Sequence, residues 1–210
     1  MQAGALRPYE DSLQTSGALG LCADDGRVIS LDVARWLAPV DAIDQTVLSR
    51  CAGPVLDVGC GPGRFVRALA EHGTAAMGVD IAETAVALTR GRGLPAVLRS
   101  VFAPIPGEGR WPTVLLMDGN IGIGGDPARL LERVRALLAP AGRLIVETHP
   151  DTHADEQLSV RFSRGGDSIG PTFAWAHVGL LPLVRYAGAL GFGVPVAWTA
   201  GGRTFASLAR

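Results

Sequence analysis

The stretch Val55-Leu56-Asp57-Val58-Gly59-Cys60-Gly61-Pro62-Gly63-Arg64-Phe65 decides the fold of this chain. Its first four residues are mostly apolar and predict a short, buried strand. Three alternate glycines then predict a tight loop, and Phe65, Val66 and Leu69 mark the apolar face of a helix. Because glycine lacks a Cβ, a ligand can lie directly against the backbone of such a loop. The stretch therefore predicts a strand, a ligand-facing loop and a helix in succession.

Strands and helices alternate on the carboxyl side of this loop. Further strands are expected at residues 75–79, 96–99, 113–117 and 143–148, and helices at 83–89, 127–138 and 180–190. The strands at 194–199 and 204–208 are separated by a short Gly-rich turn, which predicts a β-hairpin. Alternation of this kind is typical of a parallel sheet with helices on both faces. The prediction is an α/β fold whose mostly parallel sheet ends in an antiparallel hairpin.

Composition indicates a folded, soluble chain of about one domain. The 210 residues are 48% hydrophobic and 19% charged, with a formal net charge of −1. All nineteen basic residues are Arg. The lack of Lys excludes a Lys Schiff base and a Walker-type phosphate loop. The balanced charge predicts no nucleic-acid partner.

Three cysteines without C-x-x-C spacing predict neither a disulfide framework nor a zinc site, so no metal is expected. No apolar run reaches the ~18–20 residues of a membrane span, and no secretory signal is recognised at the start. We therefore expect a cytoplasmic protein without membrane contact.

The residues around the loop indicate the kind of ligand. Asp80 closes the next strand, 21 residues after Gly59, where a carboxylate can accept both hydroxyls of a ribose. A dinucleotide loop would read G-x-G-x-x-G, but here Arg64 stands at the third-glycine position. Asp57, just before the loop, would repel a pyrophosphate and attract a cation. A nucleoside with a positive centre and an amino-acid tail fits both facts.

This segment resembles the class I S-adenosylmethionine-dependent methyltransferases, and the resemblance extends over about residues 50–210. It implies a Rossmann-like three-layer sandwich with a seven-stranded sheet and a methyltransferase domain at 51–210. The N-terminal helical cap expected at 1–50 is predicted from the sequence itself, because apolar residues recur at helical spacing in residues 32–37 and 41–51. The resemblance also implies S-adenosylmethionine as cofactor. The implied cofactor-binding residues are Asp57, Gly59, Cys60, Gly61, Gly63, Asp80, Ile81, Ser100, Val101, Phe102, Met117 and Asp118. Within this set, Asp80 would hold the ribose, Ile81 would pack on the adenine, and Asp118 would lie at the methionine end.

Two further segments follow strands at the same edge of the sheet. Asp118 to Pro127 contains four glycines and the chain's single Asn, Asn120, which could face the ligand or belong to a flexible connection. Asp126 and Pro127 are typical of a helix start. His149 follows the fifth strand and is the candidate general base, although a surface role fits equally well.

The predicted function is methyl transfer to a small, partly apolar acceptor by a monomer or homodimer. Residues 1–50 and 149–180 would build the acceptor pocket, with aromatic surface from Trp36, Trp111, Phe162, Phe173 and Trp175. Two alternatives stay open. The chain could be a non-catalytic cofactor-binding or interaction protein, or a nicotinamide-dependent oxidoreductase, which Asp57 and Arg64 oppose.

Overall fold

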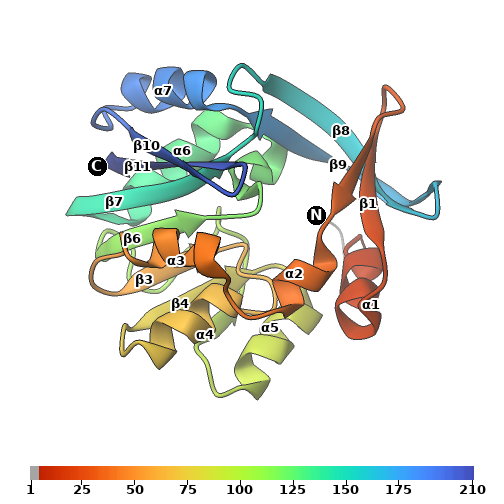
Figure 1. Cartoon of the computed structure of the whole chain (residues 1–210), viewed down its shortest axis with the longest axis horizontal. Coiled ribbons are helices and arrows are strands. Elements are labelled where there is room, and N and C mark those ends of the chain that lie inside the picture. The colour runs from red at the N-terminus through yellow and green to blue at the C-terminus, as the bar shows by residue number, and fades with distance from the viewer. Residues whose placement is uncertain (1–4) are drawn as a thin grey trace.

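A seven-stranded sheet runs through the middle of the computed structural model, which describes residues 5–210 (Figure 1). Its strand order is β10-β11-β7-β6-β3-β4-β5. The strands are β3 (Val55–Val58), β4 (Ala76–Asp80), β5 (Ala96–Leu98), β6 (Trp111–Leu116), β7 (Leu138–Thr148), β10 (Val196–Ala200) and β11 (Arg203–Ala209). From β5 to β7 every pairing is parallel, and β11 and β10 add antiparallel strands at the other edge. The predicted Rossmann-like sheet with its terminal hairpin is confirmed.

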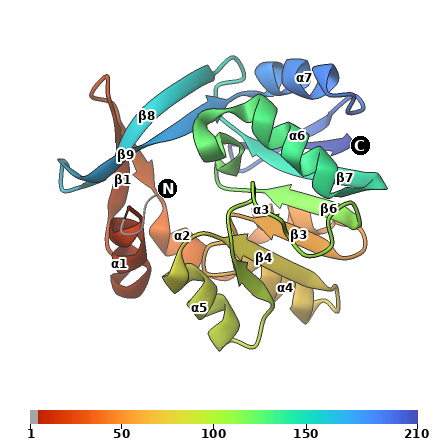
Figure 2. The same ribbon diagram turned by 180° about the vertical axis from the view of Figure 1, so that it is seen from behind.

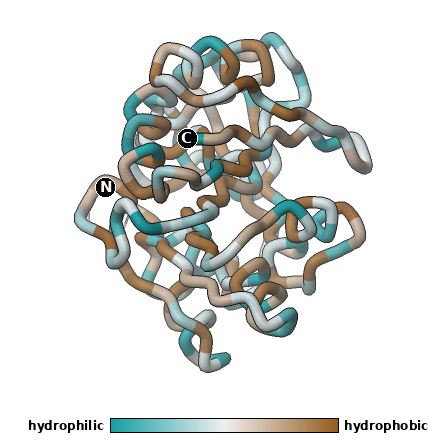
Figure 3. Tube along the Cα trace, turned by 90° about the vertical axis from the view of Figure 1, so that its left-hand side faces the viewer, coloured by the Kyte–Doolittle hydropathy of each residue, from teal (hydrophilic) through white to brown (hydrophobic). Residues whose placement is uncertain are grey.

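Helices cover both faces of this sheet, because its central strands are apolar on both sides. The helices are α3 (Ala42–Leu48), α4 (Arg64–Glu71), α5 (Glu83–Gly91), α6 (Pro127–Leu137) and α7 (Leu180–Ala189). On one face Val47 and Phe65 pack against buried strand residues, and on the other Leu130 and Leu183 do so. The two opposite views place α3 and α6 on different sides of the sheet (Figures 1 and 2). Coloured by hydropathy, the trace shows hydrophobic stretches in the interior of the molecule (Figure 3).

A second, four-stranded antiparallel sheet stands beside the first, with the order β2-β1-β8-β9. Its strands are β1 (Leu19–Ala23), β2 (Val28–Leu31), β8 (Asp155–Arg164) and β9 (Asp167–Val178). Two helices flank it, α1 (Arg7–Thr15) and α2 (Val33–Leu37). β1 pairs with β2 on one side and with β8 on the other, so that Leu21 lies opposite both Ile29 and Phe162. One sheet thus joins the start of the chain to a segment far along it.

This sheet corrects the prediction for residues 1–50, of which 1–4 lie outside the described residues. The expected helical cap contains a β-hairpin at 19–31, although its helices at α2 and α3 are present. The hairpin turn ends at Gly26, whose φ of 85° favours glycine. β1 pairs with β8, which lies far along the chain. The sequence around residues 19–23 therefore gives little indication of a strand. The domain boundary at residues 50 and 51 stays a prediction.

The order of strands in the main sheet places a crevice at one edge. After β3 the chain builds outward through β4 and β5, and then returns to the opposite side of β3 to form β6 and β7. At such a reversal the connections leave adjacent strands in opposite directions, and ligands bind outside the carboxyl ends of these strands. The glycine loop after β3 lies at this point.

Candidate functional site

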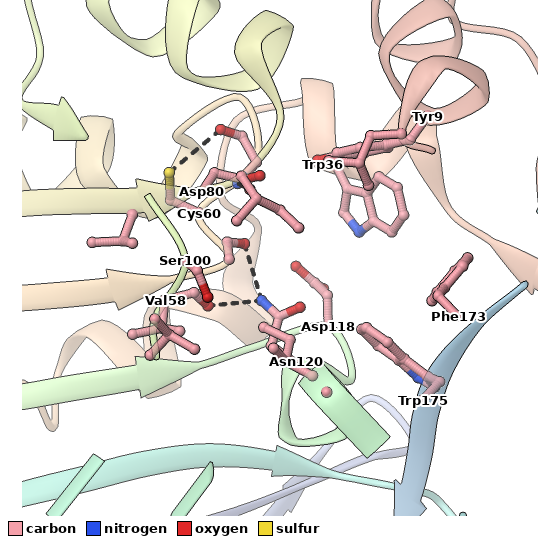
Figure 4. Close-up of a pocket in the computed structure, with 18 of the residues that line it drawn as sticks. Tyr9, Trp36, Val58, Cys60, Asp80, Ser100, Asp118, Asn120, Phe173 and Trp175 are labelled. Carbon is pink, nitrogen blue, oxygen red and sulfur yellow. Dashed lines mark hydrogen bonds between the residues drawn. The ribbon is translucent and has the colours of Figure 1, made fainter. Parts of the chain in front are cut away.

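A cavity of about 630 Å³ opens at the carboxyl ends of β3, β4 and β6 and extends to the second sheet. Ten of the twelve residues predicted to bind the cofactor line it, namely Asp57, Gly59, Cys60, Gly61, Asp80, Ile81, Ser100, Val101, Met117 and Asp118. Gly63 and Phe102 do not line it. The fold therefore gathers most of the sequence-predicted site into one space (Figure 4).

The glycine loop is shaped for close approach by a ligand. Gly59 and Gly61 have φ values of 70° and 54°, a region that residues with a Cβ rarely adopt. A Cβ on Gly61 would have only the Tyr9 hydroxyl, 3.1 Å away, within 4 Å. Gly63 has another role: it begins α4, and a Cβ there would lie 2.6 Å from Thr89 Oγ1. Gly61 thus fits a cradle for ligand, whereas Gly63 is required by packing.

Asp80 ties the loop to the end of β4. Its Oδ2 accepts a hydrogen bond from the Gly61 amide at 2.9 Å, and its Oδ1 accepts one from the Ala82 amide at 2.8 Å. Burial raises its pKa, while these amide donors act in the opposite direction. Since each carboxylate oxygen has a second lone pair, Asp80 can still accept hydrogen bonds from a ligand. Ile81 follows with its side chain partly exposed beside the cavity.

Asp57 lies beneath the loop and is almost completely buried. Burial raises its pKa to about 7; nearby Arg64 lowers the pKa, whereas Asp118 and Asp80 raise it. Arg64 itself is buried and forms ion pairs with Asp44 and, at 2.7 Å, with Asp118. The arginine at the third-glycine position is therefore a structural ion-pair partner on the cavity wall.

The loop after β6 supports the glycine loop from the other side. The Asn120 amide donates hydrogen bonds to the Val58 and Gly59 carbonyl oxygens at 2.9 and 3.0 Å (Figure 4). Asn120 lies in a 3₁₀ segment, Asn120–Gly125, that continues into α6. Asp126 caps α6 by accepting the Arg129 amide at 3.0 Å, as predicted. Asn120 is thus a support of the site as well as part of its lining.

Aromatic side chains line the cavity beyond the glycine loop, and one of them, Tyr9, reaches back to Gly61 with its hydroxyl. Tyr9 and Trp36 come from α1 and α2, and Phe173 and Trp175 come from β9 (Figure 4). Tyr9 meets Trp36 edge to face with ring centroids 5.7 Å apart, and Phe162 lies 5.1 Å from Phe173.

Two aromatic residues correct the sequence analysis of this pocket. Trp111 lies elsewhere, with its indole N–H donating to the Pro106 carbonyl oxygen. Tyr9 was not predicted, although the spacing of Tyr9 and Leu13 after Pro8 is typical of one face of a helix. Burial raises the pKa of the Tyr9 phenol, so it stays protonated near neutral pH.

The remaining candidates lie outside the cavity. Phe102 packs beneath the Arg129 guanidinium, 4.5 Å from its ring centroid. His149 stacks on His177 with ring centroids 4.7 Å apart, and its Nδ1 accepts the Asp151 amide. Neither histidine lines the cavity. Among residues 5–210 no cluster of side chains suitable for a metal ion is found, and no helix is long and apolar enough to cross a membrane.

The fold and the cavity together define a Rossmann-like protein with a site for a nucleoside cofactor beside an apolar pocket. The methyltransferase domain family matches residues 38–166, and the chain belongs to this family. The resemblance inferred from the glycine loop is thereby confirmed.

Relatives and solved structures agree with this family. A ubiquinone biosynthesis O-methyltransferase of Bordetella bronchiseptica is 28% identical over 156 residues, which are 63% of this chain and 64% of the relative. The match thus spans less than two thirds of that protein. A methyltransferase of Bacteroides fragilis, crystallised with S-adenosylhomocysteine, has a TM-score of 0.77 at 21% identity and covers 95% of this chain and 91% of its own. A Burkholderia thailandensis 1,6-didemethyltoxoflavin N1-methyltransferase has a TM-score of 0.62 at 20% identity, covering 100% and 92%.

Proposed function

We propose that this protein transfers a methyl group from S-adenosylmethionine to a small, partly apolar acceptor. One observation carries the proposal: a single cavity has the glycine loop and Asp80 at one end and Phe173 and Trp175 at the other, with Tyr9 reaching from α1 to Gly61. The first end suits a nucleoside with an amino-acid tail, and the second suits an acceptor that the two sheets enclose. One relative above is named for ubiquinone biosynthesis and one structural neighbour for the small molecule 1,6-didemethyltoxoflavin, which supports a small acceptor here.

The residues that would hold the cofactor follow from where they lie. Asp80 would accept hydrogen bonds from the ribose hydroxyls, and Gly61 would let the cofactor lie against the loop. Ile81, Ser100 and Val101 line the side of the cavity next to Asp80, where the adenine would fit. Asp118 lies between the loop and the aromatic side chains, where it would meet the methionine end (Figure 4). The donors and acceptors present thus fit the cofactor.

Catalysis in such a site depends on position. The bound cofactor supplies an electrophilic methyl group, and the protein must bring the acceptor atom in line with it and exclude water. The aromatic side chains contributed by α1, α2 and β9 would orient the acceptor and keep solvent away. His149 lies outside the cavity, so the proposal gives it no role in proton transfer.

Calorimetric titration with S-adenosylhomocysteine and with NAD tests the cofactor. We expect binding of the first and none of the second, and the reverse result would favour an oxidoreductase. Mass spectrometry of a panel of aromatic alcohols, amines and heterocycles incubated with S-adenosylmethionine then tests transfer. Binding without any product across the panel would favour the non-catalytic alternative. A cytoplasmic location, a monomeric or homodimeric state and the absence of a nucleic-acid partner stay predictions.

A further inference from the structure

A cluster of buried charges surrounds Asp118 and extends from the cavity wall, where Arg64 also lies, into the protein. We call Asp44, Arg64, Asp118, Glu147 and Arg203 the charge cluster. Its members come from α3, α4, the end of β6, β7 and β11. Their side chains are 1%, 4%, 20%, 14% and 12% exposed, respectively. Three acids and two arginines are thus gathered where the terminal hairpin meets the edge of the cavity, and the function proposed above uses only Asp118.

Asp118 has a backbone conformation that needs support. Its φ is 53°, in the left-handed region that a residue with a Cβ seldom occupies, and such conformations persist when surrounding contacts hold them. The Asp118 amide donates to Glu147 Oε2 at 2.8 Å. Both carboxylate oxygens of Asp118 accept from Arg64 Nη2, at 2.8 and 2.7 Å. Its backbone and its side chain are therefore held by different members of the charge cluster.

Arg203 connects these two contacts. Its Nε donates to Glu147 Oε1 at 2.7 Å and its Nη2 to Glu147 Oε2 at 2.5 Å, so the Glu147 carboxylate is fixed by a bidentate pair. Its Nη1 donates to Asp44 Oδ1 at 2.8 Å, and Asp44 in turn pairs with Arg64. Arg203 thus supports the Asp118 backbone through Glu147. It acts on the Asp118 carboxylate through Asp44 and Arg64, and also directly, since its Nη2 donates to Asp118 Oδ1 at 3.5 Å.

We propose that Arg203 and Glu147 are positioning residues that hold Asp118 in place to receive the amino-acid end of the cofactor. The inference rests on the proposed placement of the cofactor. A carboxylate offers about four lone-pair sites, and the two contacts from Arg64 and the longer one from Arg203 leave acceptor capacity for an ammonium group. Asp118 faces the open part of the cavity (Figure 4), so its orientation decides whether that capacity points at the ligand.

A pair of ligands tests this without any acceptor. S-adenosylhomocysteine carries the amino-acid end, and 5′-methylthioadenosine shares the nucleoside but lacks the ammonium and carboxylate groups. In Arg203→Ala we expect the Kd of S-adenosylhomocysteine to rise about tenfold or more, since the charge-assisted contact between the Asp118 carboxylate and the ligand's ammonium group is lost. The Kd of 5′-methylthioadenosine should stay within about twofold. Methylguanidinium added at millimolar concentration should restore part of the lost affinity.

Two variants serve as comparison and control. Glu147→Gln keeps an oxygen that can accept the Asp118 amide but loses the charge pair with Arg203, so we expect a smaller loss that is again confined to S-adenosylhomocysteine. Arg210→Ala removes an arginine next to β11 that donates to the Leu138 carbonyl oxygen outside the charge cluster. It should leave both Kd values unchanged.

Several results would overturn the inference. An equal loss of affinity for both ligands would mean that Arg203 acts only on the fold, and an unchanged Kd for S-adenosylhomocysteine would remove its role entirely. If Arg203→Ala does not fold, as judged by circular dichroism, the same ligand pair measured on Glu147→Gln and Arg203→Lys decides the question by the same criteria. Wild-type protein that fails to bind S-adenosylhomocysteine would instead refute the proposed function.

Discussion

Replacement of Asp80 by Ala should separate the two tasks of its carboxylate. The first task is structural, because Asp80 accepts the Gly61 and Ala82 amides at 2.9 and 2.8 Å. Leaving buried donors unpaired costs about 1–3 kcal/mol each. The two donors together give a loss of about 2–6 kcal/mol, which lowers the Tm of a chain of this size by roughly 4–24 °C. The second task is binding, where a charge-assisted contact to the ribose contributes about 1.5–3 kcal/mol, or roughly tenfold to a hundredfold in Kd.

Calorimetry with S-adenosylhomocysteine and its 2′-deoxy analogue measures the second task alone. Wild-type protein should prefer the ribose form, and Asp80→Ala should remove most of that preference. Asp126→Ala is a matched control: it loses a helix cap worth about 1 kcal/mol, at a site outside the cavity, and should keep the preference. If Asp80→Ala keeps the full preference for the ribose form, the ribose binds elsewhere and the reasoning fails.

Three further predictions concern the loop, the buried acid and the histidine. Gly61→Val should weaken the binding of S-adenosylhomocysteine at least about a hundredfold, as measured by titration. The φ of Gly61 is 54°, which valine rarely adopts, and the valine side chain would fill the space where the ligand lies, whereas Gly26→Val in the distant hairpin turn should leave the binding unchanged. Because the pKa of Asp57 is raised from 3.8 to about 7, the folded state keeps a proton between these pH values that the unfolded state has lost. The free energy of unfolding measured with urea should therefore fall as the pH rises from 3.8 to about 7. The fall should be less steep in Asp57→Asn. Methyl transfer by His149→Ala should stay within about threefold of wild type, whereas a loss of ~10²-fold or more would make it the base after all.

The main sheet could be predicted from the sequence because its signals are local. The run from Val55 to Phe65 combines a buried strand, a glycine loop and a helix start, and each strand after it is a short apolar segment between turn residues. Asp80 could be placed for the same reason, since the carboxyl ends of neighbouring parallel strands meet at one edge. The positions of these residues in the cavity follow from the topology alone.

The second sheet and Tyr9 could not be predicted in this way. β1 is a strand because Leu21 lies opposite Ile29 on one side and Phe162, far along the chain, on the other. Tyr9 reaches the cavity only because α1 packs beside this sheet. His149 was placed correctly after β7, but the residue turns to stack on His177 instead of facing the cavity. Side-chain direction at a strand end depends on tertiary neighbours that periodicity does not reveal.

The pairing of β1 with β8 has a consequence for synthesis of the chain on the ribosome. The hairpin of β1 and β2 emerges early, but β1's second partner, β8, begins only at Asp155. Until that segment leaves the exit tunnel, Leu19, Leu21 and Ala23, which the finished protein buries, have one unpaired strand edge beside them. The sheet that carries Phe173 and Trp175 is therefore completed late, after β3 to β7 have been made. A nascent chain stopped before β8 would expose an unpaired strand edge that is prone to aggregation. A chaperone that binds exposed apolar strands would bind the nascent chain at β1.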